Sequence, residues 1–313
     1  MLYVRQKFID VLEKAMEDGK KMSPEEKLFT YDGVVYPTTL CSPKVFKAME
    51  SFEARSDDVL LSGYCKSGTN WVGQVVTDLV VTSTKKHEPH KLNEKLLLAE
   101  FPYFEIGDTK KYERMNTYPP RRVMFTHLRP DKFPETFFKN KAKILLLIRN
   151  PKDVATSFFH FSNTFTAYPP YDTFGEFFSA LMIGKMPWGS YIEFLCTWNK
   201  YIDKENVLPV TYEEMKEDTV TGAKKIAEFL ELNLNEEDIH GVAERSTFKS
   251  MKENAKTTHG EMFGKILFRK GGVSDWKSLF SEENNQEMDA IFQKRLAGTK
   301  VGEKIKYDVY CKT

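Results

Sequence analysis

Residues 144–148, ILLLI, constrain the fold more than any other feature of this sequence. A strand that is apolar at every position is buried on both faces, which is typical of a parallel sheet covered by helices. Three other apolar runs, at 59–61, 123–125 and 207–210, also end just before polar or glycine-rich turns. Helical patterns follow three of the four runs, over 69–82, 151–162 and 220–230. This alternation predicts an α/β fold with a central parallel sheet flanked by helices.

The chain has 313 residues, enough for one large α/β domain or two small ones. We expect residues 1–313 to form a single domain, because the sequence shows no internal repeat and no low-complexity linker. Residues 1–30 carry an amphipathic pattern over 5–18, which predicts an N-terminal helical segment. Residues 249–275 have few apolar periods, several lysines and four glycines. They are expected to form a long loop that acts as a lid or binds a cofactor.

The charge balance argues against a protein that binds nucleic acid through a broad basic field, since the net charge is +1. The scattered cysteines, without a CxxC pair, are typical of reduced thiols. The sequence lacks the apolar run of about 18 residues that a transmembrane helix needs. The charged N-terminus lacks the apolar core of a signal peptide. We therefore expect a cytoplasmic protein with neither a nucleic-acid nor a membrane partner.

The segment GYCKSGTNW, residues 63–71, has the composition of an anion-binding loop between a strand and a helix. Unpaired N–H groups at a helix start, together with the helix dipole, favour negative charge. Lys66 adds a full positive charge. The loop departs from the GxxxxGK[ST] pattern of nucleotide triphosphatases, because its second glycine, Gly68, follows the Lys-Ser pair. The alternative interpretation is a plain helix cap with an exposed lysine.

Three further motifs carry groups suited to holding an anion or moving a proton. His127 follows an apolar run, and its pKa range suits a general base. Arg149 ends the fully apolar run, where a charge needs a partner, and Ser157 lies two turns into the next helical pattern. Arg269 and Lys270 precede two glycines that could close over a phosphate. Each motif alone also fits an ordinary histidine, a capped helix or a solvated basic turn.

In this order and spacing the motifs resemble those of the cytosolic sulfotransferases, from about residue 30 to the C-terminus. The matching segments are 64–71 for YPKSGTxW, 126–130 for THLP, 149–161 for RNPKDVxxSxxHF, 212–218 for YEEMKED and 269–276 for RKGxxGDW. The third segment matches without change. Arg129 interrupts the second, and Ser274 replaces the last glycine of the fifth. Such a set of ordered signatures makes coincidence improbable.

The resemblance implies a P-loop-like nucleotide-binding sulfotransferase fold. It implies transfer of a sulfuryl group from 3′-phosphoadenylyl sulfate (PAPS) to a hydroxyl or amine of a small acceptor, leaving 3′-phosphoadenosine 5′-phosphate (PAP). His127 would be the general base for in-line attack, Lys66 would stabilise the leaving phosphate oxygen, and Ser157 would engage Lys66 or the bridging oxygen. No metal is required, and no cluster with metal-ligand spacing is evident.

The same resemblance divides the cofactor site into three parts. These are Lys66, Ser67, Gly68, Thr69, Asn70 and Trp71 for the 5′-phosphosulfate; Arg149, Ser157, Arg269, Lys270 and Gly271 for the 3′-phosphate; and Trp71, Tyr212, Ser246 and Phe248 for adenine. The acceptor pocket is harder to predict. Its candidates are Phe101, Tyr103, Phe104, Phe159 and Phe161. Their aromatic rings suit flat, apolar acceptors such as phenols or steroids, with core packing as the alternative for at least half of them.

The chain departs from the family's pattern at three informative positions. Cys65 replaces a proline, so the loop is less stiff, and a thiol beside Lys66 at a helix start predicts a lowered pKa and sensitivity to oxidation. Phe125 stands where phenol-preferring members carry a lysine, which weakens the expectation of a charge-assisted phenol site. Glu282 disrupts the dimer motif KxxxTVxxxE that begins at Lys277, so we expect a monomer or a dimer through another surface.

Two other function classes remain open at this stage. A catalytically silent nucleotide- or ligand-binding protein would keep the fold without the reaction, and the presence of Lys66, His127, Arg149 and Ser157 together argues against it. A P-loop kinase is disfavoured by the glycine missing before Lys66 and by the lack of an evident magnesium-binding aspartate. Transfer of labelled sulfate from PAPS, compared with a His127→Ala variant, would separate the three.

Overall fold

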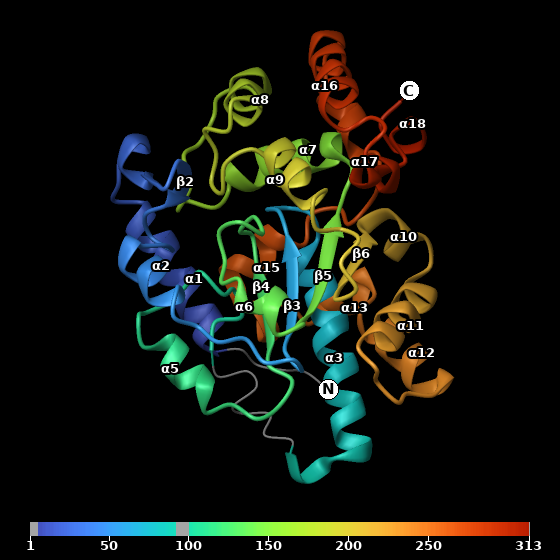
Figure 1. Cartoon of the computed structure of the whole chain (residues 1–313). Coiled ribbons are helices and arrows are strands. Elements are labelled where there is room, and N and C mark those ends of the chain that lie inside the picture. The colour runs from blue at the N-terminus through green and yellow to red at the C-terminus, as the bar shows by residue number, and fades with distance from the viewer. Residues whose placement is uncertain (1–5, 92–99, 313) are drawn as a thin grey trace.

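The computed structural model describes residues 6–91 and 100–312 of the chain (Figure 1). Within these residues, parallel strands form a central sheet in the order β4-β3-β5-β6. The strands are β3 (Val59–Gly63), β4 (Val123–Thr126), β5 (Lys143–Ile148) and β6 (Val207–Thr211). Each apolar run of the sequence therefore forms a strand. β5 is buried from Ile144 onward, as expected for a strand covered on both faces.

Helices follow the strands as the alternation predicts. α3 (Thr69–His87) follows β3, α7 (Pro151–Ser162) follows β5, and α10 (Tyr212–Glu217) and α11 (Thr219–Phe229) follow β6. α7 begins where it does because the Asn150 side chain accepts a hydrogen bond from the N–H of Asp153, and proline suits the first turn. The predicted α/β fold, a central parallel sheet flanked by helices, is confirmed.

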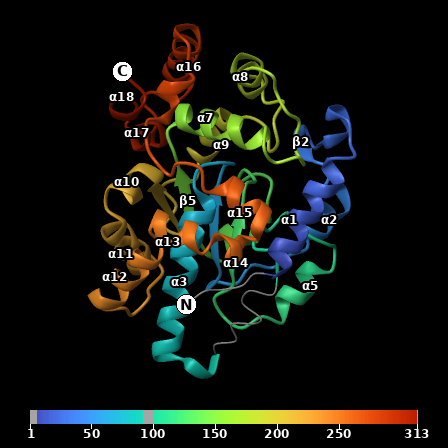
Figure 2. The same ribbon diagram turned by 180° about the vertical axis from the view of Figure 1, so that it is seen from behind.

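The other elements cover the sheet and its edges. Figure 2, seen from behind, brings α3, α13, α14 and α15 in front of the sheet, with α1 beside α15. α11 and α12 lie near the β6 edge and α1 and α2 near the β4 edge. The remaining elements are α1 (Gln6–Gly19), η1 (Pro24–Lys27), β1 (Leu28–Tyr31), β2 (Val34–Pro37), α2 (Pro43–Met49), η2 (Pro89–Lys91), α5 (Lys111–Asn116), α6 (Thr136–Lys139), α8 (Phe174–Met182), α9 (Tyr191–Trp198), α12 (Glu236–Arg245), α13 (Phe248–Glu253), α14 (Ala255–His259), α15 (Glu261–Leu267), η3 (Asp275–Ser278), α16 (Glu282–Arg295), α17 (Lys300–Ile305) and α18 (Tyr307–Tyr310).

The prediction of one long loop over 249–275 is wrong for most of that range. It contains most of α13 and all of α14 and α15, and 268–274 connects α15 to η3. Each of these helices has seven residues or fewer and buries few side chains, among them Met251 and Phe263. Helices of two turns or less are too short to show an apolar period. The predicted N-terminal helix is present as α1, and residue 5 of that prediction lies outside the described residues.

A buried ion pair connects the amino ends of the neighbouring strands β3 and β4. Arg122 precedes β4 and Asp58 precedes β3, and their side chains are 1% and 0% exposed. The Nε of Arg122 donates to Asp58 at 2.7 Å. Removing either partner would leave a charge buried without compensation. None of the helices that the structure describes has the length and apolar character needed to cross a membrane.

Candidate active site

The segment 63–71 forms a tight turn between β3 and α3, as the sequence predicts. Lys66 and Gly68 both have left-handed backbone conformations, with φ of 67° and 100°. A Cβ on Gly68 would lie 2.6 Å from Cδ2 of Tyr212, so only glycine allows this close approach. Within the described residues, Oγ1 of Thr69 is buried without a hydrogen-bond partner. The turn thus presents a polar atom and a helix N-terminus to the space beside Tyr212.

Lys66 is half-buried, and its ammonium lies over an aromatic ring from the neighbouring α7. Its Nζ lies 4.0 Å from the centroid of Phe161. Burial lowers the pKa of Lys66 to about 7, and the positive charges of Arg149 and Arg269 act in the same direction. An incoming anion would oppose both effects, so this lysine is poised to gain a proton when an anion binds.

Arg149, at the end of β5, joins two loops of the site. Its Nη1 donates to the carbonyl of Lys66 at 3.0 Å, and its Nη2 donates to the carbonyl of Gly272 at 3.2 Å. The guanidinium carbon lies 4.1 Å from the centroid of the Tyr212 ring. Its Nε is buried without a partner among the described residues. The sequence predicted that this charge needs a partner, and the carboxylate of Asp153 lies 3.8 Å from Nη2, while Nε leaves part of the donor capacity free.

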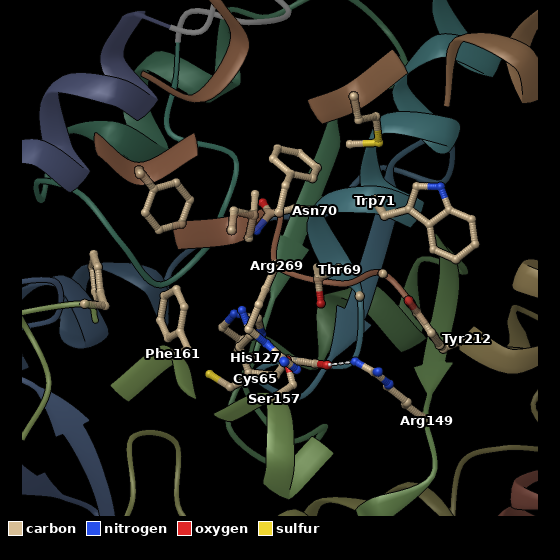
Figure 3. Close-up of a pocket in the computed structure, with 18 of the residues that line it drawn as sticks. Cys65, Thr69, Asn70, Trp71, His127, Arg149, Ser157, Phe161, Tyr212 and Arg269 are labelled. Atoms are coloured by element: carbon tan, nitrogen blue, oxygen red, sulfur yellow. Dashed lines mark hydrogen bonds between the residues drawn. The ribbon is translucent and has the colours of Figure 1, made fainter. Parts of the chain in front are cut away.

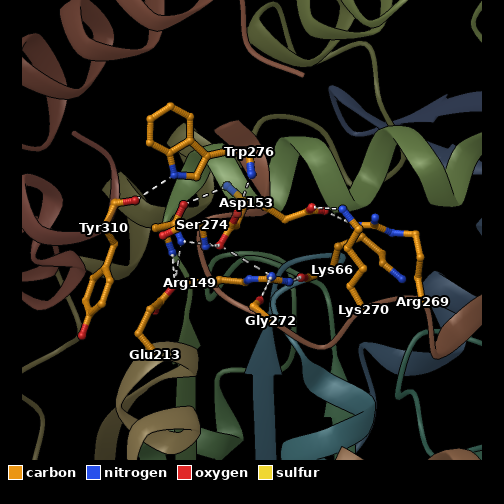
Figure 4. A network of polar contacts seen from close by, with 12 residues as sticks. Lys66, Arg149, Asp153, Glu213, Arg269, Lys270, Gly272, Ser274, Trp276 and Tyr310 are labelled. Carbon is orange, nitrogen blue, oxygen red and sulfur yellow. Dashed lines mark hydrogen bonds and ion pairs between the residues drawn. The ribbon is translucent and has the colours of Figure 1, made fainter. Parts of the chain in front are cut away.

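The basic segment 268–272 is held in place from α7 (Figure 4). The carboxylate of Asp153 accepts the N–H of Ser274 at 2.8 Å and that of Trp276 at 3.0 Å. Arg269 and Lys270 both contact the carboxylate of Asp275, with Lys270 at 2.5 Å. Two cations therefore share one carboxylate at the rim of the site, so positive charge is available there for a ligand.

His127, just after β4, has a defined tautomer. Its Nδ1 lies 2.5 Å from the carbonyl oxygen of Gly63. A carbonyl can only accept, so Nδ1 carries the proton and Nε2 is the basic nitrogen. Burial lowers the pKa of His127 to about 4, and the Gly63 hydrogen bond opposes this while the charge of Lys66 adds to it. The neutral, proton-accepting form is therefore the resting form at neutral pH.

A buried carboxylate, Glu105, holds the end of β4 in place. It accepts the main-chain N–H of His127 at 2.9 Å, the hydroxyl of Thr126 at 2.9 Å and Nε1 of Trp188 at 3.0 Å. The Trp188 ring in turn packs edge-on to His127, with centroids 5.0 Å apart. Burial raises the pKa of Glu105, and the hydrogen bonds from His127 and Thr126 oppose that rise. Glu105 was not predicted from the sequence, because an isolated glutamate in a loop gives no local signal.

The predicted site residues come together around one cavity (Figure 3). Trp71 and Tyr212 lie toward one end, and Phe161 and Cys65 toward the other. The cavity is lined by the predicted cofactor and catalytic residues Lys66, Gly68, Thr69, Asn70, Trp71, His127, Arg149, Ser157, Tyr212, Phe248, Arg269, Lys270 and Gly271, and by Phe101, Tyr103 and Phe161 from the predicted acceptor pocket. Arg149 lies at the Tyr212 end, which is therefore basic as well as aromatic, and aromatic rings such as Phe161 line the other end.

Four predicted residues do not line this cavity. Phe104 packs in the core against Phe52, with ring centroids 4.8 Å apart, and Phe159 packs against Phe174 at 5.5 Å. Phe104 thus belongs to the core, whereas Phe159 is half-buried and packs against the core. Ser67 and Ser246 are also buried. The carbonyl of Ser246 accepts Nε1 of Trp71 at 2.8 Å, so this serine positions the indole.

The prediction that the Cys65 thiol has a lowered pKa is wrong. Cys65 is 4% exposed, and burial raises the pKa of its thiol well above the usual value. The neighbouring charge of Lys66 lowers it, but by less than burial raises it. A thiol that stays protonated is a poor nucleophile toward peroxide, so sensitivity to oxidation is not expected.

Phe125 and Arg129, which depart from the family's pattern, both lie away from the cavity. Phe125 is buried against α3, where a Cβ on Gly73 would lie 2.4 Å from its ring. Arg129 pairs with Asp131 at 3.1 Å. In the part of the chain that is described, no His, Cys, Asp and Glu side chains gather as a metal site would require.

Comparison with known proteins identifies the family to which this arrangement belongs. The family profile described as "Sulfotransferase domain" matches residues 56–300. The chain belongs to the sulfotransferase family. This sulfotransferase is 47% identical to Sulfotransferase 6B1 of Mus musculus and 45% identical to that of Homo sapiens, in each case over 307 residues that cover 98% of both chains. The resemblance predicted from the ordered motifs is confirmed.

Solved structures show the same fold. Mouse sulfotransferase SULT7A1, solved in complex with PAP, matches this sulfotransferase with a TM-score of 0.75 at 30% identity, over 89% of this chain and 98% of that one. Retinol dehydratase, solved with androsterone and PAP, matches with a TM-score of 0.71 at 21% identity, over 91% of this chain and 94% of the other. The second likeness concerns the fold alone.

Several cavity residues of this sulfotransferase were not predicted from its sequence. Trp188 and Tyr168 come from the segment between α7 and α9, and Phe263 comes from α15. Phe8 and Leu12 come from α1, which precedes the first residue of the family match. Their sequence signals are those of ordinary core residues, so only the tertiary structure assigns them to the site.

Proposed function

We propose that this sulfotransferase uses PAPS as donor and transfers its sulfuryl group to a hydroxyl or amine of a small aromatic or steroid-like acceptor. PAP is the other product, no metal takes part, and the enzyme acts in the cytoplasm, as the resemblance to cytosolic sulfotransferases implies. One observation carries the proposal. Lys66 and His127 line one cavity from the ends of the neighbouring strands β3 and β4, between a basic end and an aromatic end.

The basic end fits the donor nucleotide. Oγ1 of Thr69 and Nε of Arg149 are buried there without partners among the described residues, and they can donate to phosphate oxygens. Gly271 has φ of 64°, and a Cβ on it would lie 2.3 Å from the Phe248 ring, so its backbone lies close to that ring. The structure of mouse SULT7A1 in complex with PAP supports the assignment. We assign Arg149, Ser157 and the segment 269–271 to the 3′-phosphate.

The adenine is assigned to the aromatic residues at this end. Trp71 and Tyr212 meet edge to face, with ring centroids 5.3 Å apart and planes at 74°. The indole is fixed by the hydrogen bond from its Nε1 to the Ser246 carbonyl at 2.8 Å. Phe248 borders the same end. Fixed rings lose little conformational entropy when a base stacks on them.

Bound PAPS supplies a sulfuryl group on a phosphate leaving group. Nε2 of His127 is the nitrogen free to take the proton of the acceptor hydroxyl, since Nδ1–H is committed to Gly63. The ammonium of Lys66 is placed to stabilise charge that develops on the leaving oxygen. Ser157 lines the same part of the cavity and is assigned to contact Lys66 or that oxygen. Positioning and charge stabilisation are what such a transfer requires.

The test measures transfer of labelled sulfate from PAPS over a panel of phenols, hydroxysteroids and arylamines. The wild type is expected to label at least one acceptor, and His127→Ala to lose about 10²- to 10⁴-fold in kcat. PAP affinity, measured by titration calorimetry, should stay within about twofold in that variant. A wild type that binds PAP tightly and labels no acceptor would instead establish the binding-protein alternative. No binding of PAP would refute the cofactor assignment.

A further inference from the structure

Helix α1 lies outside the residues matched by the family profile, yet it borders the cavity. The profile match begins at residue 56. Phe8 and Leu12, one turn apart on α1, line the cavity, and they are 2% and 4% exposed. Residues four apart lie on the same face of a helix. This apolar face of α1 therefore closes part of the aromatic end.

A path of touching rings connects Phe8 to the proposed base. The Phe8 ring stacks on Phe101 with centroids 5.1 Å apart and planes at 18°. Phe101 lies 5.8 Å from Tyr103, and Tyr103 lies 4.6 Å from His127. All of these rings line the cavity. Phe8 therefore lies at the far end of the wall that begins at His127.

A second path leads from Phe8 to Lys66 through a different set of rings that line the cavity. The Phe8 ring meets Phe263 of α15 edge-on, with centroids 5.8 Å apart. Phe263 lies 6.1 Å from Phe161, and Nζ of Lys66 lies 4.0 Å from the Phe161 ring. Phe8 thus joins the two aromatic walls at the end away from the reacting groups.

Polar and backbone contacts hold α1 in this position. Nζ of Lys7 pairs with the buried carboxylate of Glu100 at 2.6 Å. At the other end of the helix, the hydroxyl of Thr166 donates to the carbonyl of Met16 at 2.6 Å. A Cβ on Gly19 would lie 2.5 Å from the carbonyl oxygen of Thr166, so the helix end packs directly on that backbone. The wall is therefore anchored at both ends.

We propose that α1 forms the distal wall of the acceptor pocket and that Phe8 selects acceptors by the length and apolar character of the part remote from the reacting hydroxyl. The inference rests on the proposed function, which places the acceptor at the aromatic end. Long acceptors with flat, apolar rings reach Phe8 and gain its contact. One-ring acceptors held beside His127 do not.

The test compares Phe8→Ala and Phe8→Leu with a control on the same helix. Ile9 is also buried on α1, where it packs against Gly260 of the α14–α15 turn, but it does not line the cavity. Ile9→Ala therefore loosens the helix without removing the wall. The acceptors are 4-nitrophenol, with one ring, and dehydroepiandrosterone, a hydroxysteroid with four rings.

Phe8→Ala is expected to lower kcat/KM for the steroid about tenfold or more, through KM, and to leave that for 4-nitrophenol within about twofold. Phe8→Leu, which keeps more volume, should lose less. Ile9→Ala should leave the ratio of the two kcat/KM values within about twofold. The proposal is overturned if that ratio does not move in Phe8→Ala, or if it moves equally in Ile9→Ala.

Direct binding separates this inference from the proposed function. Calorimetry of dehydroepiandrosterone with the PAP-saturated protein should show about tenfold weaker binding in Phe8→Ala, with PAP affinity itself within about twofold. Steroid binding that depends on Phe8 without any sulfate transfer would refute the proposed function and support the wall. Sulfate transfer to the steroid, together with steroid binding that does not depend on Phe8, would overturn the proposal for Phe8 and leave the proposed function intact.

Discussion

Binding of PAP at pH 8 is expected to take up a proton, because the half-buried Lys66 has a lowered pKa in the site without a nucleotide. Burial, reinforced by the charges of Arg149 and Arg269, lowers the pKa of Lys66 to about 7. Two phosphate groups placed nearby would raise that pKa again, since an opposite charge favours the charged form. The protein with PAP bound then holds more protons on this lysine than the free protein.

The size of the effect follows from the pKa. At pH 8, a pKa of about 7 leaves roughly one tenth of the Lys66 side chains protonated, so binding takes up about 0.9 proton per site. The bound form carries the extra proton, so affinity falls as pH rises, and Kd should increase about tenfold between pH 8 and pH 9. The phosphates of PAP add little at pH 8, because their second pKa is about 6.

At pH 6 the balance reverses. Lys66 is then largely protonated before binding, because its pKa of about 7 lies above that pH. The phosphates, close to their own pKa of about 6, are expected to lose protons in a basic site. Net uptake at pH 8 should therefore give way to net release at pH 6.

Titration calorimetry in two buffers of different ionisation enthalpy measures the proton count directly. Lys66→Met should abolish the uptake at pH 8, whereas Lys216→Met, which removes another cation lining the same cavity, should retain it. Uptake below about 0.2 proton in the wild type at pH 8, or unchanged uptake in Lys66→Met, would refute the reasoning that burial keeps this lysine largely neutral.

Three further substitutions test the architecture around the site. Glu105→Ala removes the acceptor of the main-chain N–H of His127 and of the Trp188 indole, and it should lower kcat about 10- to 100-fold at unchanged PAP affinity. An equal loss of kcat and of PAP affinity would point to general unfolding. Gly68→Ala places a Cβ at φ of 100°, 2.6 Å from the Tyr212 ring, and calorimetry should show PAP binding weaker by about tenfold or more; an unchanged Kd would contradict the tight-turn argument. Arg122→Met leaves Asp58 buried without its partner and should lower the free energy of unfolding in urea by about 3–5 kcal/mol. The double variant Arg122→Met/Asp58→Leu should regain that stability. If it does not, the destabilisation does not come from the unpaired charge of Asp58.

The sheet could be predicted from the sequence because the burial pattern of a strand is carried by consecutive residues. A run that is apolar at every position, such as 144–148, is compatible with burial on both faces. The carboxyl ends of parallel strands meet at one edge, so residues that follow different strands can share a site. Lys66 after β3, His127 after β4 and Arg149 after β5 do line one cavity. The segment 249–275 was mispredicted because its helices are too short to show a period.

Only the tertiary structure decided which rings line the acceptor end. Tyr103 and Phe104 are adjacent where an isolated bridge to Phe125 leads into a turn, yet Tyr103 lines the cavity and Phe104 packs in the core. Phe159 and Phe161 lie two apart on α7, about 200° around the helix, and only Phe161 lines the cavity. From the sequence, acceptor contact and core packing remained alternatives for each of these rings, because all of them carry the same aromatic signal. Which side holds the cavity depends on what packs there, and the inclusion of Phe8 from distant α1 depends on the same long-range packing.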